Sequence, residues 1–138
     1  MRKASFVIGL CMTLALVLNA MAVQRSHPDI MKEIGAARAS LQRNIEAGNG
    51  AAAATDGEEL AGLFKETVPM YEEKNLGPAV EMANKAAAAA AEAAEAATAG
   101  NMEAATAAHG NVVAGCRGCH SQYREKSPEG GYRFKSPE

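Results

Sequence analysis

Hydrophobic residues recur every three to four positions in four separate segments of the chain, which is the period of an amphipathic helix. The first segment begins at Pro28, a favoured first-turn residue, and Gly48-Asn49-Gly50 ends it. Its apolar stripe consists of Ile30, Ile34, Ala37, Leu41 and Ile45. The spacing predicts one helix over residues 28–47 with a continuous inner face.

A second helix is predicted after a linker of residues 51–55, opened by the acidic pair at 58–59. Its inner face is marked by Leu60, Leu63, Phe64 and Tyr71. Pro69 lacks the amide hydrogen that a helix interior needs, so we expect it to kink or interrupt this helix near Val68. The helix ends by Gly77.

The third predicted helix, 78–99, is rich in alanine, which has the highest helix propensity and lets neighbouring helices approach closely. The fourth, 102–126, carries one inner face formed by Ala105, Val112, Cys116, Cys119 and Tyr123. Residues 128–138 form a polar C-terminal tail that we expect to be loose. No segment shows the alternating pattern of a strand.

Four helices with short connections favour an all-α, antiparallel up-down-up-down four-helix bundle over residues 23–127. Its core is thin, because the third helix brings mainly methyl groups inward and the chain has no tryptophan. Each buried leucine of an ordinary bundle contributes about 1.5–3 kcal/mol. We therefore expect a flat apolar group, such as a porphyrin, to fill the middle.

The N-terminus has the organisation of a secretory signal peptide. Arg2 and Lys3 precede an apolar run over residues 6–18, and an Ala-x-Ala site ends at Ala22. We expect residues 1–22 to be cleaved, which takes Cys11 away, exports the chain to the periplasm and leaves no stable membrane anchor. An uncleaved membrane anchor is the alternative.

The charge of the chain is mildly acidic. It has 14 basic and 16 acidic residues, and without Arg2 and Lys3 the balance is 12 against 16, a net charge of about −4. No basic stripe indicates nucleic-acid binding. Residues 116–138 are the exception, with five basic and three acidic side chains.

The segment Cys116-Arg117-Gly118-Cys119-His120 carries the chemistry. On a helix, positions i, i+3 and i+4 share one face, so the two thiols and the imidazole point the same way. This pattern is the attachment signal for a c-type haem, in which two thiols bond to the porphyrin and the adjacent histidine binds the iron. We expect one covalent haem per chain, with His120 as its proximal iron ligand.

Other uses of the motif fit less well. A thioredoxin-like dithiol expects a strand that leads into a helix, and the chain has no such unit. A structural zinc site needs four ligands, and only His27 and His109 remain as further histidines. Two buried cysteines beside a surface histidine explain neither the spacing nor the thin core.

Residues 27–126 resemble the cytochrome c-prime family, the class II c-type cytochromes. The resemblance rests on IMKEIGAARASL near the mature N-terminus and on AGNMEAATAAHGNVVAGCRGCHSQYR, which puts the motif on the last helix. Residues 51–98 agree only in helical layout. The resemblance implies a bundle around one haem, with thioethers at Cys116 and Cys119, His120 as proximal ligand, and Arg124 close to the proximal haem face. An ordinary solvated charge is the alternative for Arg124.

The resemblance puts Met31 on the distal side of the iron and leaves two functions open. If Met31 binds the iron, which we favour, the protein is a six-coordinate electron carrier; if it only packs there, as most methionines do in cores, the protein binds or buffers small gases such as nitric oxide. Four residues earlier the family often has an arginine that contacts a haem propionate. Here His27 stands in that place, with Arg25 nearby as a substitute.

We therefore expect an exported monohaem cytochrome that carries single electrons between redox partner proteins. Arg117, Arg124 and Lys126 would orient its docking on an acidic partner surface, although each has an ordinary solvated role as its alternative. The resemblance also implies a homodimer formed through the first two helices. No acid–base pair or nucleophile indicates enzymatic turnover. A helical domain without haem remains the third alternative.

Overall fold

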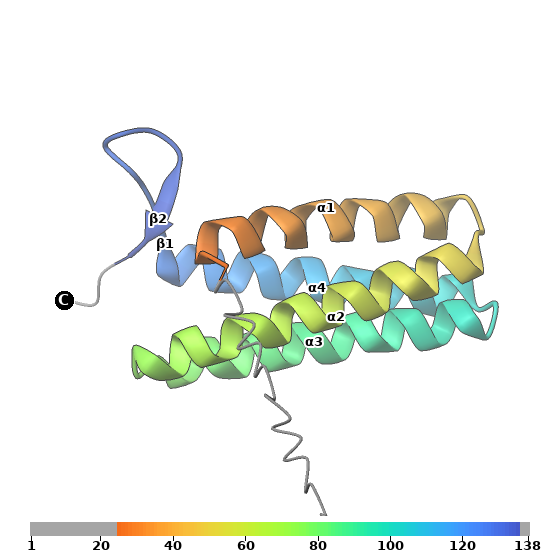
Figure 1. Cartoon of the computed structure of the whole chain (residues 1–138). Helices are drawn as coiled ribbons and strands as arrows, with labels where there is room; N and C mark the ends of the chain where they lie inside the picture. Colours follow the sequence, from red (N-terminus) through yellow and green to blue (C-terminus); the bar gives the residue numbers. More distant parts are fainter. Residues whose placement is uncertain (1–24, 136–138) are drawn as a thin grey trace, which may run out of the picture.

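The computed structural model describes residues 25–135, and four helices make up most of them. These are α1 (His27–Glu46), α2 (Gly50–Glu73), α3 (Gly77–Thr98) and α4 (Met102–Tyr123). The helices lie side by side, with α2 packed against α1 and α3, and α4 against α3 and α1 (Figure 1). The predicted all-helical, four-helix bundle is confirmed at this level.

The predicted signal peptide, residues 1–22, lies outside the described residues, as do the last three residues of the chain. Between residues 25 and 135, no helix is long and apolar enough to cross a membrane.

Local sequence explains where the helices begin and end. Ser26, Asn49 and Asn101 are N-caps whose side-chain oxygens each accept a hydrogen bond from the backbone N–H three residues later, at 3.3, 3.4 and 3.0 Å. Gly48 and Gly100 follow the ends of α1 and α3 with φ of 67° and 73°, a conformation that favours glycine. Connections of three residues result, which hold consecutive helices together.

Two expectations about α2, the linker and an interruption at Pro69, differ from the structure. Residues 51–55 are not a linker but the first turns of α2, because Asn49 caps this end and the run of alanines favours helix. The helix is also not interrupted at Pro69 but continues to Glu73. Tyr71, two residues past the proline, is buried, and this packing stabilises the last turn.

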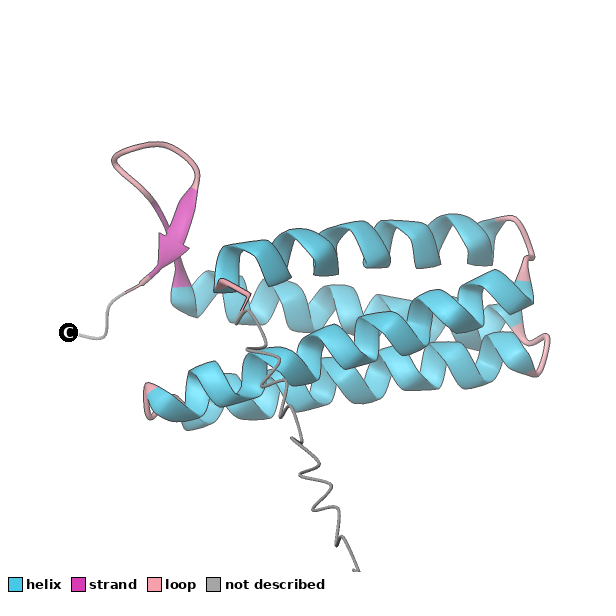
Figure 2. Ribbon diagram, in the orientation of Figure 1, coloured by secondary structure: helices cyan, strands magenta, loops and turns pink. Residues whose placement is uncertain are grey.

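The end of α4 differs from the prediction as well. The helix ends at Tyr123, and β1 (Arg124–Lys126) pairs antiparallel with β2 (Tyr132–Phe134), so the chain from 124 to 134 is a hairpin and not a helix end with a loose tail (Figure 2). Gly130 and Gly131, with φ of 95° and 75°, allow the turn between the strands.

The core is built from one large-residue face and one small-residue face. The predicted stripe of α1 is buried, whereas every buried residue of α3 is an alanine. Gly57 of α2 marks a close approach to α3, because a Cβ added there would lie 2.9 Å from the Ala90 carbonyl oxygen and 2.9 Å from the Ala94 Cβ. The bundle therefore relies on close helix contact where α2 meets α3.

Candidate functional site

The motif residues lie on the last two turns of α4. Cys116, Cys119 and His120 are each half-buried, and both cysteines are free thiols. They border two adjoining cavities of about 330 and 350 Å³. His120 and Cys119 line both cavities, while Cys116 lines only the second. The shared face predicted for the three side chains is consistent with this placement.

The two cavities differ in their walls. The first, which we call the hairpin cavity, is walled by α1, α2, the end of α4 and the hairpin residues Tyr132, Arg133 and Phe134. The second, the bundle cavity, lies between the four helices, and its apolar lining includes Ile34, Phe64, Met82 and Ala86. Five residues line both: Met31, Tyr71, Cys119, His120 and Arg124.

Met31, the candidate distal ligand, comes from the neighbouring helix α1. It is half-buried and packs against the hydrophobic core. Because it borders the same two cavities as His120, the fold brings the predicted proximal and distal residues to one site although 89 positions separate them in the chain. Ligation of iron by Met31 stays a prediction.

The electrostatics of the motif favour uncharged groups. Burial raises the pKa of the Cys116 thiol, and burial followed by the neighbouring Cys116 raises the pKa of the Cys119 thiol. Burial and then the positive charge of Arg124 lower the pKa of His120. At neutral pH the site therefore presents two neutral thiols and a neutral imidazole, whose free nitrogen lone pair can bind a metal.

A second histidine stands at the same site. Nε2 of His27 lies 2.9 Å from the phenol oxygen of Tyr71. Burial lowers the pKa of His27, with smaller contributions from His120 and Lys74. Burial also raises the pKa of Tyr71 to about 12, so both partners of this hydrogen bond are neutral near pH 7.

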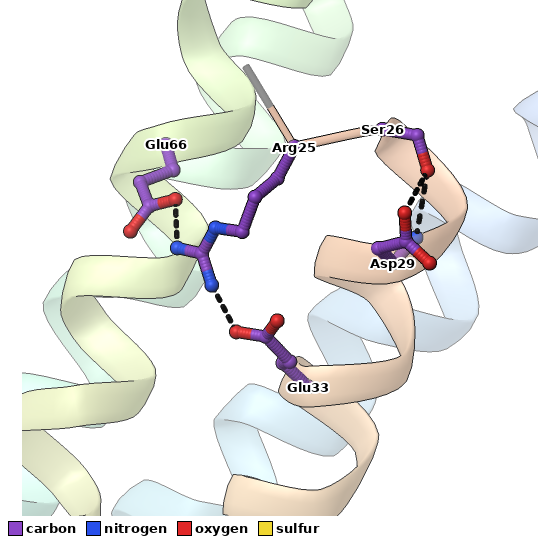
Figure 3. Close-up of polar contacts among 5 residues, drawn as sticks. All are labelled: Arg25, Ser26, Asp29, Glu33 and Glu66. Atoms are coloured by element: carbon purple, nitrogen blue, oxygen red, sulfur yellow. Dashed lines mark hydrogen bonds and ion pairs between the residues drawn. The ribbon is translucent and has the colours of Figure 1, made fainter. Parts of the chain in front are cut away.

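Arg25, the predicted substitute for the family arginine, is engaged elsewhere. Its guanidinium bonds to Glu33 of α1 and Glu66 of α2 and does not border either cavity (Figure 3). The cations that do line the hairpin cavity are Lys32, Arg124 and Arg133. Arg124 also lies over the ring of Tyr132, at 4.0 Å from its centroid.

Sequence reasoning missed the aromatic residues around the hairpin cavity. It put Tyr71 and Tyr123 on inner helix faces without a role, and it assigned Tyr132 and Phe134 to the loose tail. Two glycines precede the alternating segment Tyr132-Arg133-Phe134. Together they are a weak turn and strand signal that could have indicated the hairpin.

A metal site made only of protein side chains is not present between residues 25 and 135. No three histidine, cysteine or carboxylate side chains come together there in a way that could hold an ion. A structural zinc site needs four such ligands.

The chain matches no model of a known protein family, no curated protein and no solved structure. The similarity to the cytochrome c-prime family therefore stays a hypothesis that rests on the motif and its surroundings.

Proposed function

We propose that this chain is an exported monohaem c-type cytochrome of the c-prime kind, which carries single electrons. The observation that carries the proposal is the position of Cys116, Cys119 and His120, which all border a pair of adjoining cavities that Met31 also borders. A c-type haem site requires two thiols and a histidine on one side of a cavity that is otherwise largely apolar.

The cavities suit a flat apolar ligand with a few polar groups. Each has a volume in the range of ligand sites, about 300–1,000 Å³, and they meet at Cys119 and His120. Short connections between neighbouring helices favour the up-down-up-down arrangement, in which such a cavity opens between helix faces. The alanine face of α3 leaves room that larger side chains would fill.

When bound, haem supplies a one-electron iron couple whose potential depends on axial ligands and burial. The residues of the chain have separate tasks. Cys116 and Cys119 would hold the haem through thioether bonds, each of which would form by addition of S–H across a vinyl double bond with no leaving group. His120 would bind the iron through the lone pair of its neutral imidazole nitrogen, and the thioether sulfur of Met31 would be the other protein ligand. The apolar side chains of the bundle cavity exclude water.

The carboxylates of the haem need cationic partners. Because Arg25 is bonded to Glu33 and Glu66, we assign this task to Lys32 and Arg133 at the hairpin cavity. Arg133 already donates to Glu125 at 2.7 Å but remains exposed, so its guanidinium has further donors available.

Electron transfer also needs a docking surface. A shallow surface depression beside His120 is lined by Arg117, Arg124 and Lys126, together with one carboxylate, Glu125. This positive patch on an otherwise acidic chain suits an acidic partner, which it would attract over about 10 Å at moderate ionic strength. Reversing the charge of Arg117 and Lys126 is expected to weaken the salt dependence of electron-transfer rates; unchanged dependence would contradict the docking role.

Acid–acetone extraction of protein produced in cells that mature c-type cytochromes tests the haem assignment. The wild-type polypeptide should keep its colour, and the double variant C116A/C119A should lose it. His109→Gln is the matched control, because His109 is on the same helix but lines neither cavity. A colourless wild-type polypeptide would overturn the proposal.

A further inference from the structure

One aromatic side chain of the C-terminal hairpin packs against the bundle. The ring of Phe134 is stacked on Tyr123 of α4 at 5.7 Å between centroids, lies 5.9 Å from Tyr71 of α2, and meets His27 of α1 edge-on at 5.6 Å. Phe134 therefore contacts three helices at once, from a segment that lies beyond the last of them.

Backbone and polar contacts fix the hairpin in the same place. The N–H of Lys135 donates to the Tyr123 carbonyl oxygen at 2.7 Å, next to Phe134. Across the strands, Arg133 donates to Glu125, and Arg124 lies over the ring of Tyr132. The strands have only three residues each, and a two-stranded hairpin of this size is marginally stable by itself. Its position consequently depends on its contacts with the bundle, which are those of Phe134 and the hydrogen bond of Lys135.

The hairpin closes one particular part of the site. Tyr132, Arg133 and Phe134 are walls of the hairpin cavity, which also contains His120 and Cys119. These three hairpin residues do not border the bundle cavity. Cys116 lines the bundle cavity but not the hairpin cavity. In Figure 1 the hairpin stands at the end of the bundle where α1 begins and α4 ends.

We propose that the hairpin is a clasp that closes the hairpin cavity, and that Phe134 is its latch. The clasp shields Cys119 and His120 from solvent. Because it is held by one aromatic contact set and a few hydrogen bonds, it opens locally at lower free energy than the bundle unfolds. Its effect on a bound haem rests on the proposed function; its closure of the cavity does not.

Cysteine alkylation tests the clasp in the full mature chain with free thiols, the state that the structure describes. Iodoacetamide labelling is followed at each cysteine by mass spectrometry for the wild type and for Phe134→Ala. We expect Phe134→Ala to label severalfold faster at Cys119 and little faster at Cys116, which borders the other cavity. Pro128→Ala, an exposed hairpin position that lines neither cavity, should react as the wild type does.

Three results would overturn the proposal. They are an unchanged rate at Cys119 in Phe134→Ala, an equal rise at both cysteines, and a wild-type Cys119 that reacts as fast in buffer as in denaturant. Should Phe134→Ala lose its helical circular dichroism, Phe134→Leu takes its place with a smaller expected rise, because leucine keeps part of the apolar contact.

In the haem-loaded protein the clasp should also affect the reduction potential. Opening the cavity to water favours the more highly charged ferric state, so Phe134→Ala should lower the potential while Pro128→Ala leaves it unchanged. An unchanged potential in Phe134→Ala would contradict the clasp. If the proposed function fails, the wild type carries no haem, and the alkylation result still decides whether the clasp exists.

Discussion

His27 and Tyr71 join α1 to α2 beside the candidate site through a hydrogen bond of 2.9 Å between the imidazole Nε2 and the phenol oxygen. His27 occupies the position where the resemblance implies a propionate-binding arginine. The pair gives the hairpin cavity a neutral polar lining. The rings of both residues lie against Phe134 of the hairpin.

The burial of this pair should be visible in an alkaline titration. The pKa of Tyr71 is raised to about 12 from an ordinary value of about 10, so its phenol should ionise in a last step near pH 12. Ultraviolet absorbance of Tyr71→Phe should lack this last step. Tyr132→Phe, which removes an exposed phenol, should retain it, and loss of the last step in Tyr132→Phe instead would contradict the assignment.

The close packing of α2 on α3 predicts opposite effects for two glycines of one helix. Gly57→Ala puts a Cβ 2.9 Å from the Ala90 carbonyl oxygen, and overpacking of this kind should lower the free energy of unfolding by about 2 kcal/mol. A Cβ added at Gly62 meets no atom within 4 Å. Gly62→Ala should therefore raise the free energy of unfolding by up to about 1 kcal/mol, since alanine favours helix. Urea unfolding followed by circular dichroism measures both, and equal effects would refute the close contact.

His109 should make the protein sensitive to acid. It is buried in α4, its Nε2 has no hydrogen-bond partner between residues 25 and 135, and burial followed by the charge of Arg38 lowers its pKa. Below the ordinary histidine pKa of about 6.5 the unfolded chain therefore binds the proton more readily, and the free energy of unfolding falls as pH falls.

The variant His109→Leu isolates this contribution. Between about pH 7 and about pH 5 its loss of unfolding free energy should be smaller than that of the wild type. The loss should not vanish, because the pKa values of His27 and His120 are lowered too. Identical pH profiles of variant and wild type would show that His109 titrates normally in the folded protein.

Met31 separates the electron carrier from the gas-binding alternative. In the haem-loaded carrier, Met31→Leu removes the sixth ligand, so the low-spin spectrum should become high-spin and the reduced protein should bind carbon monoxide readily. Met82→Leu is the matched control, because Met82 lines only the bundle cavity. A wild type that is already high-spin, with an unchanged spectrum in Met31→Leu, would favour gas binding instead.

The sequence contains strong signals for the helices and weak ones for their ends. The three-to-four spacing of the apolar stripe from Ile30 to Ile45 predicted α1 correctly, because one buried stripe is enough to define a helix face. The start of α2 was missed because an alanine run has no apolar periodicity, although its propensity is high. The helix continues past Pro69 because the packing of Tyr71 outweighs a local preference.

The residues of the candidate site were also predicted only in part from the sequence. Cys116, Cys119 and His120 are neighbours in sequence, so their common location follows from helix geometry. Tyr71, Lys32 and Phe134 reach the cavity through tertiary contacts between distant segments. The hairpin in particular depends on Phe134 meeting three helices, and no local pattern reports such a contact.

The central claim is that a haem is bonded to Cys116 and Cys119. The intact mass of the mature polypeptide, measured after denaturation in acid, tests it most directly. The account predicts the mass of residues 23–138 plus one haem, with the added mass on the proteolytic peptide that contains both cysteines. The bare polypeptide mass, from cells that load a known c-type cytochrome in parallel, would contradict it.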